Sequence, residues 1–142
     1  MLVKDMMSGR VITVRAEESA ATAARLLARH NIGALPVCGE NGRLRGVVTD
    51  RDIILRCVAA DEDPAQTKVA DIMTRRIVSV SPDETADCAA QRMAQEQVRR
   101  LPVTRDGRLV GMLSLSDFAR LPDFSVEAAA ALSEISLNVH NR

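Results

Sequence analysis

The 142-residue chain carries 19 Lys and Arg against 19 Asp and Glu, so its formal net charge is zero, and 46% of its residues are apolar. This composition excludes a disordered chain, and neutrality with only two aromatic residues argues against nucleic acid as a partner. No apolar run approaches the roughly 20 residues of a membrane span, and the N-terminus lacks the basic and apolar regions of a signal peptide. We therefore expect a cytoplasmic protein with no membrane contact.

The predicted elements form one series that occurs twice along the chain. Residues 11–14 and 77–80 are short β-branched runs that predict strands. Small and apolar residues then recur at spacings of three and four, which predicts amphipathic helices from Glu18 to His30 and around residues 86–94. A hairpin follows in each copy, at 34–37 with 44–48 and at 101–103 with 109–113. A second helix closes each series, at 50–59 and 115–121.

A direct comparison of the chain with itself confirms this repetition. A shift of 66 places Leu35, Pro36 and Val37 on identical residues, and after one deletion a shift of 65 places Asp52 on Asp117. The chain is therefore divided into β-α-β-β-α motifs at 3–60 and 69–121, with a polar linker at 61–68 and a tail at 122–142. The apolar residues of the tail predict a helix that packs back on the module or meets a partner.

Neither motif is expected to stand alone. A unit of about 60 residues rarely buries enough apolar surface for independent stability, so the two copies should share one core. We predict an α/β (α+β) fold in which the two motifs pack with pseudo-two-fold symmetry into one module.

The cysteines indicate neither a disulfide framework nor a zinc site. Cys38, Cys57 and Cys88 are an odd, widely spaced set without a C-x-x-C pair. We interpret them as ordinary semi-buried thiols, with a redox role for the more loop-like Cys38 as the alternative. The sequence shows no nucleophile with a base and no metal-ligand spacing. We therefore expect no catalytic residue, no metal and no enzymatic activity.

Three short motifs occur in the same order in both copies. Asp5, Met7 and Ser8 begin the first copy, Leu35, Pro36 and Val37 lie in its middle, and Gly46 to Asp52 ends it. Their counterparts run from Asp71 to Asp117. With these motifs the chain resembles the cystathionine-β-synthase (CBS) domain family, in the tandem arrangement often called a Bateman module. The resemblance covers residues 3 to about 121.

The resemblance implies a regulatory module that binds AMP, ADP, ATP, S-adenosylmethionine or NAD in clefts between the motifs. It requires no further cofactor. The cleft with the Asp of the second motif would be lined by Thr13, Val14, Arg99, Arg100, Leu101, Pro102, Ser114, Ser116 and Asp117. The cleft with the Asp of the first motif would be lined by Ala34, Leu35, Pro36, Thr49, Arg51, Asp52, Ser79 and Val80.

Elementary chemistry is consistent with these roles. An ionised carboxylate only accepts hydrogen bonds, so Asp52 or Asp117 suits the two vicinal hydroxyls of a ribose. Thr49 and Ser114 lie at strand-to-helix turns, where a hydroxyl meets free backbone N–H groups that favour an anion. The same letters also form a helix capping box, which needs no ligand. Both interpretations stay open.

The two clefts are expected to differ. Arg99 and Arg100 precede Leu-Pro-Val in the second motif, where an arginine can fork onto a phosphate, whereas the first motif has Gly33 and Ala34. We therefore prefer the cleft with Asp117 as the nucleotide site. A solvated surface pair is the alternative for the two arginines.

Two functions compete at this stage. The first is an adenine-nucleotide sensor whose ligand shifts conformations that an effector protein, of unknown identity, detects. The second is a ligand-free interaction or stress-response module that docks partners. In both cases the resemblance implies a homodimer, a flat disc of two chains.

Overall fold

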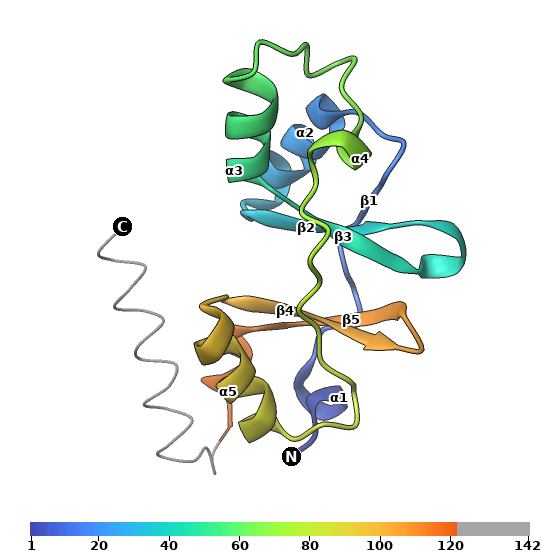
Figure 1. Cartoon of the computed structure of the whole chain (residues 1–142). Coiled ribbons are helices and arrows are strands. Elements are labelled where there is room, and N and C mark those ends of the chain that lie inside the picture. The colour runs from blue at the N-terminus through green and yellow to red at the C-terminus, as the bar shows by residue number, and fades with distance from the viewer. Residues whose placement is uncertain (122–142) are drawn as a thin grey trace. The chain divides into compact units, whose positions relative to one another are not determined.

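The computed structural model describes residues 1–121, which form short helices and two small sheets (Figure 1). The prediction of a mixed α and β fold is confirmed. Two compact units divide the chain. Within the described residues, the first-copy unit consists of residues 12–77 with 107–109, and the second-copy unit consists of residues 1–11, 78–106 and 110–121. The predicted helix in the tail lies outside the described residues.

The first-copy unit contains a three-stranded sheet in the order β1-β2-β3. Strand β1 (Val14–Arg15) pairs in parallel with β2 (Ala34–Cys38), which pairs antiparallel with β3 (Leu44–Thr49) across the turn η1 (Glu40–Gly42). Helix α2 (Ala20–His30) connects β1 to β2. Helix α3 (Asp50–Ile53), the π-helical turn η2 (Ile54–Val58) and helix α4 (Val69–Ile72) follow.

The second-copy unit repeats this plan with fewer regular residues. Helix α1 (Val3–Met6) begins the chain, and helix α5 (Ala86–Glu96) precedes the strands β4 (Arg100–Arg105) and β5 (Arg108–Ser114). Those strands form a two-stranded sheet, and helix α6 (Leu115–Phe118) ends the series. The second helices of both copies are thus present but shorter as α-helices than predicted.

The two long helices are capped at both ends, and the first begins at Ala20, two residues after the predicted start at Glu18. The hydroxyl of Ser19 accepts a hydrogen bond from the Thr22 N–H at 3.1 Å, and that of Thr85 accepts one from the Cys88 N–H at 3.1 Å. Each helix closes on a residue in the left-handed region. Five alanines of the predicted stripes are buried, Ala20, Ala23, Ala86, Ala89 and Ala90, whereas Ala24 and Ala94 are half-buried and Ala28 is exposed. The prediction of two amphipathic helices is confirmed.

The predicted first strands are the main local error. Only Val14 and Arg15 form a strand in the first copy, and Val80 makes a single parallel bridge to Val103 in the second. The preceding apolar residues Ile12 and Ile77 are exposed. The chain passes from one unit to the other at these positions, so only the last residue of each predicted run, Val14 or Val80, pairs with a strand.

The segment that precedes each first strand belongs to the unit of the other copy. Val3 N–H donates to the Glu84 carbonyl at 2.9 Å, and Ser8 exchanges two backbone hydrogen bonds with Met112, all within the second-copy unit. Val69 N–H donates to the Glu18 carbonyl at 2.8 Å, and Thr74 exchanges two with Val47, within the first-copy unit. The two copies therefore exchange their leading segments.

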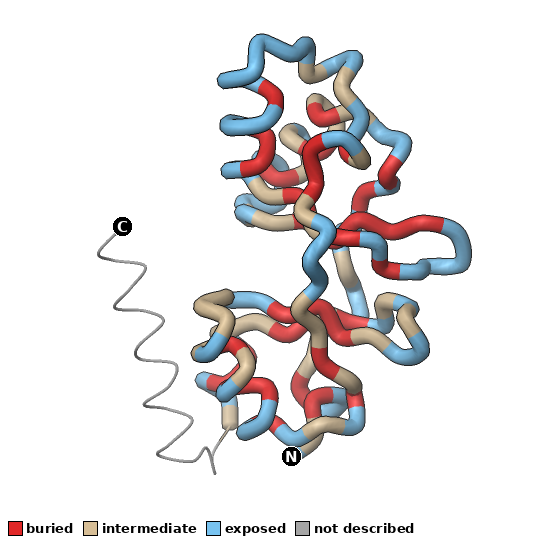
Figure 2. Tube along the Cα trace, viewed as in Figure 1, coloured by how far each residue is buried: buried red, intermediate tan, exposed pale blue. Residues whose placement is uncertain are grey.

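Buried apolar side chains form two clusters instead of one shared core, so that prediction is wrong for the described residues (Figure 2). One cluster gathers α2, β2 and β3 with Val69 and Ile72 of α4. The other gathers α5, β4 and β5 with Val3 and Met6 of α1. Each core is still incomplete without a segment of the other copy, which agrees with the expectation that neither motif stands alone.

Candidate functional site

The predicted serines and aspartate of the second copy meet at the turn from β5 to α6. Ser114 N–H donates to Asp117 Oδ2 at 2.7 Å, and the hydroxyls of Ser114 and Ser116 lie 2.8 Å apart. Asp117 is buried, with 7% of its surface exposed, whereas Ser116 is exposed. The turn therefore presents two hydroxyls beside one buried carboxylate.

Arg99 lies next to this turn. Its carbonyl accepts a hydrogen bond from the Leu115 N–H at 2.9 Å, which holds the residue before β4 against the start of α6. Arg99 and Arg100 are exposed, and neither pairs with a carboxylate of residues 1–121. Leu101 and Pro102, which follow on β4, are buried. The structure thus places the Arg99 backbone beside the turn that carries Ser114 and Asp117, and it leaves the Arg99 side chain exposed.

A residue that the sequence analysis missed also contacts this carboxylate. Arg120 Nη2 lies 2.5 Å from Asp117 Oδ1. The side chain of Arg120 is 74% exposed, so solvent screens most of this attraction. Asp117 and Arg120 are three residues apart on the predicted helix, and this spacing was the sequence signal that could have indicated the pair.

The counterpart in the first copy is a complete capping box. Asp52 N–H donates to Thr49 Oγ1 at 3.0 Å, and Thr49 N–H donates to Asp52 Oδ2 at 3.0 Å. Asp52 is as buried as Asp117, and Arg51 is exposed. The capping-box interpretation of this motif is therefore realised at Asp52, and a capping box is also present at Ser114 and Asp117.

Two further side chains surround Asp52, and the sequence analysis named neither. Thr74 Oγ1 lies 3.2 Å from each carboxylate oxygen. Arg56 Nε lies 3.9 Å from Oδ1, and its Nη1 donates to the carbonyls of Ile72 and Met73 at 3.2 Å. Thr74 is 22 residues away in sequence. It reaches Asp52 because the leading segments are exchanged.

The remaining predicted residues divide between the two units. Thr13 is exposed directly before β1, and Val14 is buried within it. On β2, Leu35 and Pro36 are buried, and Ala34 is partly exposed. Ser79 and Val80 belong to the second-copy unit. Their joint action with an aspartate of the other unit stays a prediction.

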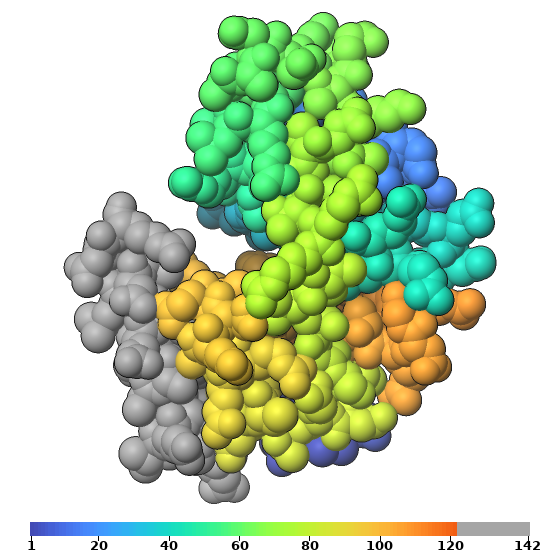
Figure 3. Space-filling model, viewed as in Figure 1, coloured from blue at the N-terminus to red at the C-terminus, as the bar shows by residue number. Residues whose placement is uncertain are grey.

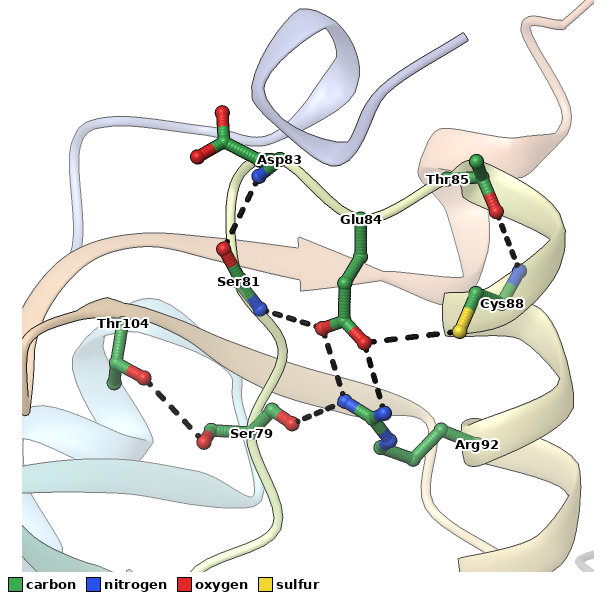
Figure 4. Close-up of polar contacts among 8 residues, drawn as sticks. All are labelled: Ser79, Ser81, Asp83, Glu84, Thr85, Cys88, Arg92 and Thr104. Atoms are coloured by element: carbon green, nitrogen blue, oxygen red, sulfur yellow. Dashed lines mark hydrogen bonds and ion pairs between the residues drawn. The ribbon is translucent and has the colours of Figure 1, made fainter.

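A second polar cluster, also unpredicted, links helix α5 to the segment before it (Figure 4). Arg92 donates to both oxygens of Glu84, at 2.9 and 3.1 Å, and to the Ser79 carbonyl at 2.7 Å. Burial raises the pKa of Glu84, but Arg92 and the Ser81 N–H outweigh it, so the pKa is lowered overall. In the first copy the equivalent residue is Leu26. An arginine in place of an apolar residue of the repeat was the sequence signal that could have indicated this cluster.

The three cysteines differ in accessibility, and Cys38 is not loop-like. It is buried at the end of β2, and burial raises the pKa of its thiol, which disfavours the reactive thiolate. Cys57 is buried as well, whereas Cys88 is exposed on α5.

We expect a thiol reagent to label one cysteine of the native protein, Cys88, and all three after unfolding. Mass spectrometry of the labelled peptides measures this directly. The Cys88→Ser variant should show no fast labelling. Rapid native labelling at Cys38 would contradict the burial described above.

Within residues 1–121, no group of three His, Cys, Asp or Glu side chains could hold a metal ion. Nor does any helix of this part of the chain have the length and apolar character needed to cross a membrane.

Comparisons with known proteins give the family. The CBS domain model matches residues 3–59 and 69–124. The chain is 42% identical to CBS domain-containing protein YhcV of Bacillus subtilis, over 97% of this chain and 98% of that protein. It is 36% identical to Hypoxic response protein 1 of Mycobacterium tuberculosis, over 87% of each chain.

Solved structures agree with this assignment. A crystal structure of Hypoxic Response Protein I with two coordinated zinc ions superposes with a TM-score of 0.79 at 36% identity, covering 86% of this chain and 100% of that one. The CBS domain pair of protein MJ0100, in complex with 5′-methylthioadenosine and S-adenosyl-L-methionine, gives a TM-score of 0.71 at 34% identity, covering 84% and 94%. The chain therefore belongs to the CBS domain family, as a pair of CBS domains.

Proposed function

We propose that this CBS pair is a regulatory module that binds an adenosine-containing ligand through Asp117, with AMP, ADP or ATP preferred. The observation that carries the proposal is the group formed by Ser114, Ser116, Asp117 and Arg99 at one turn of the second-copy unit. It combines an acceptor for ribose hydroxyls, two hydroxyls that can donate, and a cation for phosphate.

The carboxylate of Asp117 retains capacity for a ligand. An ionised carboxylate has about four acceptor positions, and the described contacts use one on each oxygen. One of those contacts comes from the largely exposed Arg120, which a ligand can displace at small cost. The two vicinal hydroxyls of a ribose suit the remaining positions.

The relatives support the class of ligand. The structure of the MJ0100 pair holds two compounds that share an adenosyl group. In this chain Arg99 and Arg100 are exposed, and the Arg99 backbone is bonded to the start of α6, the helix that carries Asp117. Two exposed cations on this part of the unit favour phosphate and disfavour the cationic sulfonium of S-adenosylmethionine. We therefore place adenine nucleotides above S-adenosylmethionine in affinity.

The role proposed is regulatory, without a catalytic step. A ligand that binds one conformation better than another shifts the population of the two, and an effector protein detects the change. We propose that the module acts as a homodimer, as the resemblance implies. An assay of nucleotide hydrolysis should show no turnover.

Isothermal titration with AMP, ADP, ATP, S-adenosylmethionine and NAD tests the proposal. We expect one nucleotide per chain, and we expect Asp117→Asn to weaken binding by about ten- to a hundredfold, because a hydrogen bond to a charged group contributes about 1.5–3 kcal/mol. Asp52→Asn is the matched control in the first copy and should leave the affinity unchanged. Equal binding by the wild-type protein and Asp117→Asn, or no binding by the wild-type protein, would refute the site.

A second function is favoured by a different observation. Ile54, Leu55 and Val58 on η2 are each at least 50% exposed. The segment η2 lies in the green part of the surface in Figure 3. Exposed apolar residues on one segment are typical of an interaction surface. A ligand-free docking module would show no thermal shift with any nucleotide, and it would lose its partner when these residues are replaced by Ser.

A further inference from the structure

We propose that Thr74 closes the ribose position at Asp52 with its own hydroxyl, so that Asp117 is the aspartate open to a ligand. The inference rests on the proposed function, in which these aspartates accept ribose hydroxyls. It assigns a specificity role to a residue that belongs to the second copy in sequence and contacts the first.

Side chains and backbone of this chain already occupy the hydrogen-bonding positions of the Asp52 carboxylate. Thr74 Oγ1 is 3.2 Å from both Oδ1 and Oδ2, so it sits across the carboxylate where a ligand hydroxyl would have to lie. The Thr49 N–H and Arg56 approach the same two oxygens. A ribose hydroxyl entering here would replace a hydrogen bond that already exists, with little net gain.

Thr74 is also held in this position by its backbone. Its N–H donates to the Val47 carbonyl at 2.8 Å, and its carbonyl accepts from the Val47 N–H at 3.0 Å. A Cβ at Gly46 would lie 2.6 Å from the Thr74 carbonyl oxygen, so the glycine permits this close approach. Arg56 fixes the preceding turn through the Ile72 and Met73 carbonyls. The hydroxyl therefore cannot leave Asp52 by a simple movement of an exposed loop.

The second copy keeps the backbone arrangement and lacks the hydroxyl contact. Ser8 exchanges hydrogen bonds with Met112 at 2.9 and 3.0 Å, as Thr74 does with Val47. Its hydroxyl, however, donates to the Arg10 carbonyl at 3.3 Å and is exposed. The described partners of the Asp117 carboxylate are the Ser114 N–H and the exposed Arg120. The same position is thus filled at Asp52 and open at Asp117.

Titration with AMP in the Asp117→Asn background tests the inference, because AMP binding at Asp117 is weakened there. Asp117→Asn/Thr74→Ala should bind one AMP per chain at least tenfold more tightly than Asp117→Asn alone. Adding Asp52→Asn to the Asp117→Asn/Thr74→Ala variant should abolish that gain in affinity. Thr74→Ser keeps the hydroxyl and should give no gain, and Ser8→Ala in the wild-type chain should leave AMP affinity unchanged.

Folding and the proposed function are controlled separately. Thermal unfolding checks each variant, and Thr74→Val, which retains the β-branched shape, should give a smaller gain if Thr74→Ala is too unstable. The proposed function fails if the wild-type protein does not bind or if Asp117→Asn binds equally well. The inference fails if the folded variants Asp117→Asn/Thr74→Ala and Asp117→Asn/Thr74→Val bind AMP no better than Asp117→Asn. It also fails if Asp117→Asn retains AMP binding that is lost when Asp52→Asn is added to it.

Discussion

Ile72→Ala is expected to lower the free energy of unfolding by about 2–5 kcal/mol, the usual cost of truncating a large buried aliphatic side chain. Ile72 is 2% exposed and belongs to the core of the first-copy unit, although it lies in the second sequence repeat. The loss should therefore appear first in α2, as faster amide hydrogen exchange at residues 20–30. Urea unfolding together with hydrogen exchange measured by mass spectrometry reports both effects.

Met6→Ala is the matched experiment, because Met6 occupies the position of Ile72 in the other repeat. Met6 packs in the core of the second-copy unit, so exchange should accelerate at α5 and not at α2. If each leading segment packed in the core of its own sequence repeat, the pattern would be the opposite, with Met6→Ala affecting α2 and Ile72→Ala affecting α5. That pattern would refute the exchange of the leading segments.

Glu84→Gln is expected to lower stability at pH 7 by about 1–2 kcal/mol, because Arg92 loses a two-pronged ionic partner that is only partly exposed. The pKa of Glu84 is lowered in the folded protein, whereas the pKa of a Glu in an unfolded chain is about 4.3. The ionised group therefore stabilises the fold above that pH, and the contribution is lost as the pH falls through the folded pKa.

Urea unfolding between pH 7 and pH 3 should show the difference between the wild-type protein and Glu84→Gln shrinking toward acid pH. Glu18→Gln is the control from the first copy. Glu18 accepts a hydrogen bond from the Arg15 N–H, as Glu84 does from Ser81, but Leu26 replaces the arginine there. A larger loss in Glu18→Gln than in Glu84→Gln would show that the ion pair adds nothing.

Local features of this chain were predictable where a single segment supplies its own hydrogen bonds. The caps Ser19 and Thr85 and the alanine faces of α2 and α5 follow from spacing within about a dozen residues. The turn that carries Ser114 and Asp117 was equally predictable, because a strand, a hydroxyl and an acid three residues later define it. The predicted strands at 11–14 and 77–80 are realised only at Val14 and Val80, because a strand requires a neighbour, which the segment itself does not specify.

The candidate site also combines features that were predictable from the sequence with features that were not. Asp52 and Asp117 were identified from sequence as equivalent residues, and they are equally buried. Their difference comes from Thr74, Arg56 and Arg120, of which Thr74 is brought in by the tertiary structure from 22 residues away. No periodicity or spacing reveals such a contact.

The sequence by itself determined that one unit occurs twice and that each copy ends in a capped turn with a buried acid. Only the tertiary structure decided which core each leading segment completes. Val3 and Val69, Asp5 and Asp71, and Met7 and Met73 are identical pairs. The apolar surface that each segment buries is therefore nearly the same in either core, and burial energy cannot distinguish the two arrangements. The tertiary structure places Thr74 on Asp52 and Ser8 beside β5.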